Sequence, residues 1–339
     1  MLDISYSSIL DGIKMSIQIP TLRDVYKARK VIYRYLPKTP LRYSRRLSRI
    51  FGFDVYLKLE NLQPTGAFKV RGGTYYVNVM KEEALRRGVI SASTGNHGQS
   101  IAYAGTLIGA EVTIVIPEGI PKVKVEALKD LGAEIITHGR YYEEARIYAE
   151  KIAEEKGMLY VHGVNEPLLY AGVGTMHLEN IEDLPDVDVI INPIGGGSGA
   201  SSAVIVAKSI DPAIKVIGVQ ADGAKSFYLS WRNGRLTSTG KAETIAEGLA
   251  TGKAYKLPFA ILKDKIDDVL LVSDMEIKRA MKLLLEVTGQ AVEPSGAAAT
   301  AAAWKFKEKI KGKKVIIMIT GGNVDPTLLR EISEMESWW

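Results

Sequence analysis

The fold is decided by the stretch Val189-Ile190-Ile191-Asn192-Pro193-Ile194-Gly195-Gly196-Gly197-Ser198-Gly199-Ala200. An apolar, β-branched strand comes first, a glycine-rich turn follows, and a helical run from Ala200 to Lys208 comes next. Glycines at such a junction let backbone N–H groups approach an anion at the start of a helix. We therefore predict a phosphate-binding loop formed by Gly195, Gly196, Gly197, Ser198 and Gly199.

The rest of the chain repeats this alternation of strands and helices. Helical apolar spacing is clear at Val123–Leu131, Tyr142–Glu155 and Glu276–Val287. Strands are predicted at Val55–Leu59, Val89–Ala92, Val112–Ile116, Ile135–Thr137, Leu159–His162, Val187–Asn192, Val216–Gln220, Val269–Val272 and Val315–Ile319. This order predicts an α/β fold with parallel sheets joined by right-handed crossovers.

The four strands between Val89 and His162 form a self-contained unit. We expect residues 81–165 to make a small, mobile domain inserted into a large, discontinuous one made of residues 1–80 and 166–339. Two such domains create a cleft, where α/β folds usually bind their ligands.

The composition of the 339-residue chain is that of a soluble globular protein, with 46% hydrophobic and 24% charged residues. The absence of cysteine excludes disulfides and thiolate chemistry. No signal peptide is visible in the first thirty residues, and no apolar run is long enough to span a membrane, so we expect a cytoplasmic protein. The basic stretch Lys27–Arg49 could contact nucleic acid, but a net charge of only +5 favours a solvated helix face. We expect neither a nucleic-acid nor a membrane partner.

A second motif places a lysine in a turn rich in proline and glycine: Gln63-Pro64-Thr65-Gly66-Ala67-Phe68-Lys69-Val70-Arg71-Gly72-Gly73. A lysine held in this way is displayed in a defined direction. Lysine forms Schiff bases when its surroundings lower its pKa. Together with the glycine loops, Lys69 suggests a phosphorylated aldehyde cofactor bound as an imine.

A third motif, Ser93-Thr94-Gly95-Asn96-His97-Gly98-Gln99, also lies between a strand and a helix. Hydroxyl, amide and backbone N–H groups at a helix start suit a carboxylate. The alternative is that Ser93 or Thr94 simply caps a helix running through Gly105.

The fourth motif, Thr320-Gly321-Gly322-Asn323, follows the strand Val315–Ile319. A hydroxyl at the carboxyl end of a strand faces the ligand crevice, although Thr320 could equally cap a turn. Glu293 is either a charged group near the cofactor or an exposed loop carboxylate.

A rival interpretation exists for the glycine loop. The spacing of Gly195, Gly197 and Ala200, with Asp222 after the next strand, fits a dinucleotide fingerprint. An NAD-dependent dehydrogenase would explain this loop, but it would leave the Lys69 turn unexplained.

Taken together, the four motifs resemble those of pyridoxal-phosphate enzymes of fold type II, the tryptophan synthase β-like fold, over about residues 20 to 330. The resemblance is strongest to serine/threonine dehydratases (threonine ammonia-lyases) and serine racemases. It implies pyridoxal 5'-phosphate as cofactor, bound in the cleft between two domains. It also implies that Lys69 is both the imine lysine and the base that removes the substrate's Cα proton.

The resemblance implies further roles. Phe68 would pack beside the cofactor, Asn96 would bind its ring hydroxyl and Thr320 would face its ring nitrogen. Ser93, Thr94, Asn96 and His97 would hold the substrate, and Thr94 is also a candidate catalytic residue. Relatives that bind a divalent ion carry acidic residues where Gln220 and Ser226 align, so we expect no metal.

The function predicted is a β-elimination that converts L-threonine, L-serine or both into a 2-oxo acid and ammonia. Threonine synthase and serine racemase stay open as alternatives, because Ser93-Thr94-Gly95-Asn96 also resembles threonine synthases. An amino acid is the expected substrate, and a homodimer or homotetramer the expected assembly.

Overall fold

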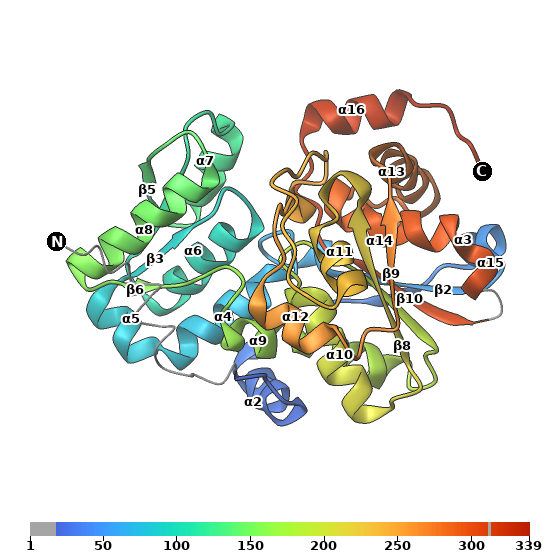
Figure 1. The fold of residues 1–339 in the computed structure, drawn as a ribbon, viewed down its shortest axis with the longest axis horizontal. Helices are drawn as coiled ribbons and strands as arrows, with labels where there is room; N and C mark the ends of the chain where they lie inside the picture. The colour runs from blue at the N-terminus through green and yellow to red at the C-terminus, as the bar shows by residue number, and fades with distance from the viewer. Residues whose placement is uncertain (1–17, 311–312) are drawn as a thin grey trace.

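The computed structural model describes residues 18–310 and 313–339 and contains two β-sheets (Figure 1). The large sheet and its helices form the right-hand part of Figure 1, and the small sheet with its helices forms the left-hand part. The strands are β1 (Leu41–Tyr43), β2 (Asp54–Leu59), β3 (Val89–Ala92), β4 (Val112–Ile116), β5 (Glu134–Thr137), β6 (Leu159–Tyr160), β7 (Val189–Pro193), β8 (Lys215–Ala221), β9 (Asp268–Val272) and β10 (Lys314–Ile319). The longer helices are α2 (Leu22–Ile32), α3 (Arg45–Phe51), α4 (Lys69–Val79), α5 (Lys81–Arg87), α6 (Asn96–Ile108), α7 (Lys122–Asp130), α8 (Tyr142–Lys156), α9 (Pro167–Asp183), α10 (Ser198–Ile210), α11 (Ser226–Asn233), α12 (Lys256–Leu262), α13 (Asp274–Thr288), α14 (Pro294–Lys305) and α16 (Pro326–Glu334). Four shorter helices complete the described chain: η1 (Glu60–Leu62), η2 (Asp222–Ala224), η3 (Glu247–Leu249) and α15 (Lys307–Ile310).

The large sheet has six strands in the order β1-β2-β10-β7-β8-β9. All neighbours are parallel except β1, which runs antiparallel to β2 at the edge. Its two faces are covered by different helices, so residues along one strand alternate between two cores. In β10, for example, Val315 and Ile317 join the core under α13 and α14, whereas Ile316 and Met318 join the core that includes α9 and α10.

The small sheet has four parallel strands in the order β5-β4-β3-β6. Burial on both faces explains why its central strands, β3 and β4, are apolar except for one hydroxyl residue each, Ser91 and Thr113, rather than alternating. The α/β fold with parallel sheets is therefore confirmed. All four strands fall within residues 81–165, and the other six lie outside it, but the precise domain limits remain a prediction.

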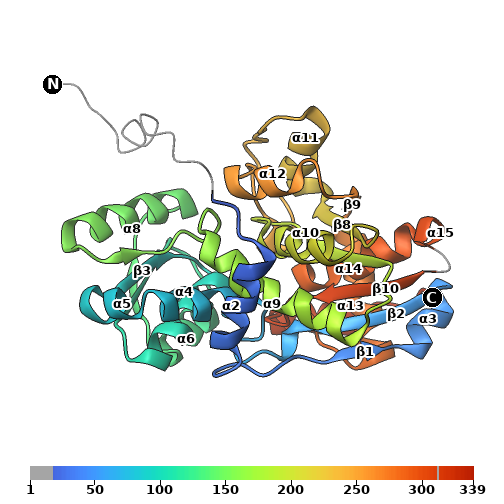
Figure 2. The same ribbon diagram turned by 90° about the horizontal axis from the view of Figure 1, so that it is seen from below.

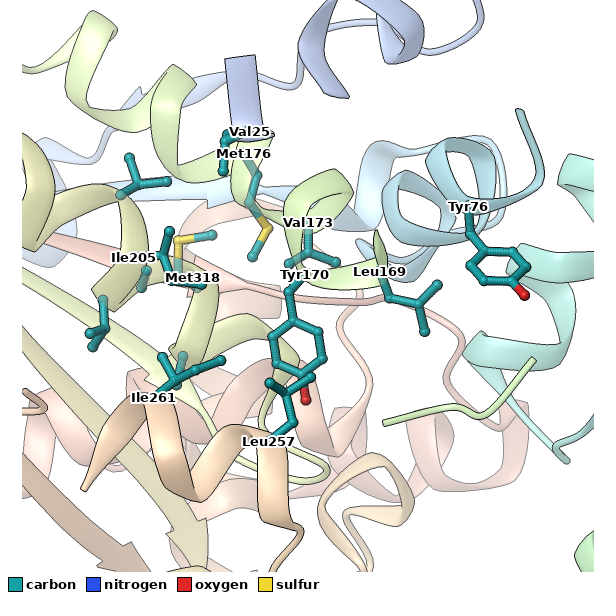
Figure 3. Close-up of a cluster of buried hydrophobic side chains, with 14 of the residues drawn as sticks. Val25, Tyr76, Leu169, Tyr170, Val173, Met176, Ile205, Leu257, Ile261 and Met318 are labelled. Carbon is teal, nitrogen blue, oxygen red and sulfur yellow. The ribbon is translucent and has the colours of Figure 1, made fainter. Parts of the chain in front are cut away.

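Helices α4 and α9 join the two sheets into one continuous core. The same cluster of buried side chains contains Ile114 of the small sheet and Ile190 of the large one. Figure 3 shows part of this cluster, with Leu169, Tyr170, Val173 and Met176 of α9 and Leu257 and Ile261 of α12; the Tyr170 ring points toward Leu257. Helix α4, which begins at Lys69, is thus fixed by packing before any ligand is considered.

Helix α2 lies beside α9 (Figure 2) and explains part of the basic stretch. Arg29 pairs with Glu182, and Lys38 pairs with Asp183, both acids of α9. These two basic side chains of the stretch therefore bind the protein's own acids.

No helix among residues 18–310 and 313–339 is long and apolar enough to cross a membrane. Part of the stretch judged to lack a signal peptide, residues 1–17, lies outside the described residues. Strand β1 was not predicted from the sequence, because three residues at a sheet edge carry too short a pattern to recognise.

Candidate active site

The Lys69 turn is held against the loop that follows β10. The backbone N–H of Phe68 donates to the Thr320 carbonyl at 3.0 Å, and the N–H of Gly322 donates to the Gly66 carbonyl at 2.9 Å. A bridge between Ala67 and Gly321 lies between these two bonds. Two motifs about 250 residues apart in the chain are therefore joined by their backbones, with Lys69 at the first position of α4.

The Lys69 amine points to the glycine loop. Its Nζ atom donates to the Ser198 hydroxyl at 3.0 Å, and it lies 5.2 Å from the centre of the Phe68 ring. Burial lowers the pKa of the Lys69 amine to about 8, because desolvation disfavours the charged form. The structure thus places the predicted reactive lysine beside the predicted phosphate loop and makes it easier to deprotonate.

The glycine loop begins α10 and is packed too tightly for larger residues. A Cβ atom at Gly195 would lie 1.9 Å from the Gly248 carbonyl oxygen, and Gly197 has a φ of +98°, which favours glycine. Below the loop, the buried His177 bonds the Gly199 carbonyl through Nε2 at 3.1 Å. Burial lowers the pKa of His177 to about 3, so the ring is neutral and Nε2 carries the proton that it donates.

The polar loop at residues 93–99 is not the simple helix cap that the sequence allowed. Helix α6 has Gly95 as its N-cap and receives no side-chain capping bond, so the alternative in which Ser93 or Thr94 caps this helix is wrong. Ser93 instead accepts from the Gly95 N–H at 3.3 Å. The loop's side chains are left free for other contacts.

His97 of this loop is held in one tautomer. Ser91 donates its only hydroxyl proton to the Val161 carbonyl at 2.8 Å, so His97 Nε2, 3.1 Å from the same hydroxyl, must be the donor. Burial lowers the pKa of His97 to about 3, with the nearby Lys69 charge as a smaller cause. A neutral His97 therefore presents a fixed, uncharged ring.

Asn96 connects the polar loop to the Thr320 loop. Its Oδ1 accepts from Asn323 Nδ2 at 2.8 Å, and its Nδ2 donates to Glu293 Oε1 at 2.9 Å. Glu293 is only 8% exposed, so its interpretation as an exposed loop carboxylate is wrong. The sequence leaves Glu293 open as a charged group near the cofactor, includes Asn323 only as part of the Thr320 motif, and assigns neither residue a role in the site.

A fully buried ionic network lies behind Lys69, two residues along α4. Arg71 donates to Glu60 through Nε and Nη2, both at 2.8 Å, and to Glu179 through Nη1 at 2.7 Å and Nη2 at 2.9 Å. Lys58 also donates to Glu179, at 2.5 Å. Two cations and two carboxylates therefore balance each other and tie α4 to β2, η1 and α9.

Two predicted site residues remain without such contacts. Thr94 is partly exposed before α6, and Thr320 is 4% exposed at the end of β10. Neither hydroxyl takes part in a hydrogen bond with the described residues. Thr94 lies just before α6 and Thr320 just after β10, and their roles stay predictions.

Gln220 and Ser226, the residues that led us to expect no metal, both form hydrogen bonds within the protein. Gln220 donates to the Ile194 carbonyl at 3.2 Å and accepts from the Tyr228 N–H at 2.8 Å, while Ser226 donates to the Thr251 carbonyl at 2.9 Å. Within the part of the chain that the structure describes, no three His, Cys, Asp or Glu side chains are grouped to hold an ion. The absence of a metal requirement remains a prediction.

Comparison with known proteins identifies the family. Residues 32–321 match the family described as "Pyridoxal-phosphate dependent enzyme". The chain belongs to this family. It is 40% identical to an L-threonine ammonia-lyase of Thermotoga maritima over 92% of this chain and 78% of the relative. It is 37% identical to an L-threo-3-hydroxyaspartate ammonia-lyase of Saccharomyces cerevisiae over 91% of this chain and 94% of the relative. The structure of maize serine racemase superposes with a TM-score of 0.89, at 33% identity and with 93% and 97% of the two chains covered.

Membership confirms the fold type II assignment and pyridoxal phosphate as cofactor, and it leaves the dehydrogenase alternative without support. The residues present fit this cofactor. A phosphate needs N–H donors and space close to the backbone, which the Gly195–Gly199 loop provides at the start of a thirteen-residue helix. An aldehyde needs an amine that is neutral part of the time, which Lys69 provides.

Proposed function

We propose that this pyridoxal-phosphate lyase eliminates water from L-threonine and L-serine and releases the 2-oxo acid and ammonia. The observation that carries the proposal is the position of the Lys69 amine, with its lowered pKa: it lies 3.0 Å from Ser198 of the glycine loop and close enough to His97 of the polar loop for its charge to lower the His97 pKa. The names of the threonine ammonia-lyase relatives support the choice of reaction.

The binding roles follow the motifs. Backbone N–H groups of Gly195–Gly199, with Ser198, would hold the phosphate. Phe68 would pack against the ring, Asn96 would meet the ring hydroxyl, and Thr320 would face the ring nitrogen. Ser93, Thr94, Asn96 and His97 would bind the substrate, and its carboxylate suits the N-terminal end of α6. Their hydrogen bonds would hold the Cα–H bond in the direction of Lys69.

The proton is moved by Lys69. When bound, the cofactor supplies an electron-withdrawing ring that makes the Cα proton of an attached amino acid acidic. With a pKa of about 8, the Lys69 amine is neutral often enough near pH 7.5 to accept that proton at Nζ. Ser198, 3.0 Å away, orients the amine.

The overall reaction balances without a further reactant. Loss of the Cα proton and the β-hydroxyl group forms water and leaves an enamine. Hydrolysis of the imine tautomer consumes one water and releases ammonia, so threonine gives 2-oxobutanoate and serine gives pyruvate.

The alternatives on the same cofactor have weaker support. A serine racemase needs a second acid–base group on the other face of the ring, and Thr94 is the candidate from the sequence. A threonine synthase needs an additional phosphate-binding site, and the sequence offers no spare glycine loop for one. The cytoplasmic location, the homodimer or homotetramer and the activity on serine are part of this proposal.

A product assay tests the proposal. We expect 2-oxobutanoate from L-threonine and pyruvate from L-serine, with little D-serine formed. Threonine formed from O-phosphohomoserine, with no 2-oxo acid from either amino acid, would contradict the lyase and favour the synthase.

A further inference from the structure

Glu293 is a buried carboxyl group that the proposed reaction does not use. It precedes Pro294 at the start of α14, and its side chain lies against the loop that follows β10. The approach is close, because a Cβ atom at Gly321 would lie 2.5 Å from Glu293 Oε1. A carboxylate held so closely needs partners that compensate for its lost water.

The partners of Glu293 can be assigned by following the hydrogen bonds. Asn323 lies 2.9 Å from the Thr65 carbonyl, which can only accept, so the nitrogen of the Asn323 amide must face it. The same nitrogen lies 2.8 Å from the Asn96 side chain, so the Asn96 atom there is the oxygen. The Asn96 nitrogen therefore faces Glu293, with one N–H donated to the carboxylate and the other making no hydrogen bond with residues 18–310 or 313–339.

This chain of bonds connects the two sheets of the molecule. Asn96 begins α6, which packs on the small sheet, whereas Glu293 and Asn323 belong to the large-sheet part. A second contact nearby also joins the two parts, because Lys124 of α7 pairs with Glu247 of η3. Of the two contacts, only the first involves a residue of the proposed cofactor site.

We propose that Glu293 is a positioning residue that holds the Asn96 amide across the boundary between the two sheets and so directs its free N–H toward the cofactor. This inference rests on the proposed role of Asn96 at the ring hydroxyl. Glu293 itself acts through Asn96 rather than on the substrate.

Most of the groups that face Glu293 are hydrogen-bond donors or positively charged, and these stabilise its ionised form. Asn96 and the backbone N–H of Asn323 both donate toward it, Lys124 adds a positive charge, and Glu247 adds a negative one. Burial is the largest influence and raises the pKa of Glu293 to about 7. Below that pH the carboxyl group carries a proton that meets donors rather than acceptors, so its hold on Asn96 weakens.

The test compares Glu293→Gln with a matched control, Glu166→Gln. Glu166 also precedes a proline at a helix start and also has a pKa raised by burial, but it accepts only from Leu168 of its own helix. The first measurement is amide hydrogen exchange on the cofactor-free protein. We expect several-fold faster exchange at residues 96–99 of α6 in Glu293→Gln and wild-type exchange there in Glu166→Gln.

The second measurement is cofactor binding, followed by the visible absorbance of the bound cofactor. We expect Glu293→Gln to bind pyridoxal phosphate about tenfold more weakly than wild type at pH 8.5, and within about twofold of it at pH 5.5, where wild-type Glu293 is also uncharged. In an Asn96→Ala background, Glu293→Gln should add little further loss. Glu293→Asp, which keeps the charge but is too short to reach Asn96, should behave like Glu293→Gln at pH 8.5.

Two results would overturn the inference: unchanged exchange at residues 96–99 in Glu293→Gln, or an equal loss of cofactor affinity in the wild-type and Asn96→Ala backgrounds. The exchange experiment uses neither cofactor nor substrate. It therefore tests the contact between Glu293 and Asn96 even if the product assay rejects the proposed reaction.

Discussion

Glu179 and Glu293 are both buried carboxylates near the proposed site, Glu179 against Arg71 of α4 and Glu293 against Asn96 of α6, but their charges are balanced differently. Glu179 accepts from two cations, Arg71 and Lys58, inside a fully buried network. Burial alone would raise the pKa of Glu179, but Arg71 and Lys58 hold it below its usual range. Glu293 has amide donors and only a distant lysine, and the pKa of its carboxyl group is raised to about 7.

The opposite pKa shifts of Glu179 and Glu293 indicate different roles. The network of Glu179 is a scaffold that fixes the structure, whereas the contact of Glu293 with Asn96 changes with pH. Arg71 and Lys58 hold the pKa of Glu179 below its usual range, so Glu179 keeps its charge at neutral pH and can hold α4 and Lys69 in one position. A single carboxyl group that titrates near neutral pH changes its contacts under physiological conditions. The following variants test this contrast, beginning with the largest expected effect.

Arg71→Leu should break the scaffold. Glu60 and Glu179 would be left buried with only Lys58 as a counter-charge, so we expect the free energy of unfolding to fall by about 3–5 kcal/mol. Urea denaturation measures this change. Arg29→Ala is the control, because Arg29 and Glu182 form a partly exposed pair that should contribute less than about 1 kcal/mol. Equal effects of the two variants would mean that the buried network is not a scaffold.

Glu293→Gln should change how stability depends on pH. In the folded protein the Glu293 pKa is raised from 4.5 to about 7, so the stability that it contributes is full below pH 4.5 and is lost as the pH rises through 7. The loss amounts to about 3 kcal/mol at most. The melting temperature of wild type should therefore fall relative to that of Glu293→Gln between pH 5 and pH 8.5.

The exposed N-cap Asp325, which also precedes a proline, provides the control for that experiment. Asp325→Asn should keep the wild-type trend across this pH range. A constant difference between wild type and Glu293→Gln from pH 5 to pH 8.5 would show that Glu293 does not titrate there.

His177→Leu should have the smallest effect. The substitution removes the Nε2–H that holds the Gly199 carbonyl, and also the Nδ1 atom that lies 3.4 Å from Asn180 Nδ2. Loss of the bond to the Gly199 carbonyl, about 1 kcal/mol, should weaken pyridoxal phosphate binding roughly three- to tenfold, as measured by titration of the cofactor-free protein. His138→Leu is the control, because His138 is exposed and stacks only on Tyr148. Unchanged affinity in His177→Leu would mean that the loop holds its shape without this bond.

The regular elements could be predicted well from the sequence because each depends on local periodicity. All nine predicted strands correspond to strands of the structure, and the glycine loop lies at the start of α10 as expected. The contact of Lys69 with Ser198 was anticipated only in outline, because the sequence assigns the Lys69 turn and the glycine loop to one cofactor site without predicting which side chains meet.

The surroundings of Glu293 could not be predicted in the same way. Its burial depends on the close approach of Gly321, far away in the chain, and on the packing of the alanine-rich α14. One signal was present: a carboxylate directly before Pro294 and a run of small residues must lie at the N-terminal end of a buried helix. The contacts of Asn96 with Glu293 and Asn323 left no pattern in the sequence, because they arise only when the two sheets come together.

The most direct test of the central claim is to locate the lysine that carries the cofactor. The protein is reduced with borohydride in the presence of pyridoxal phosphate, digested, and mapped by mass spectrometry. We predict a single pyridoxyl group on Lys69, with the visible absorbance lost in Lys69→Ala. A pyridoxyl group on another lysine, with the absorbance of Lys69→Ala unchanged, would contradict the site described here.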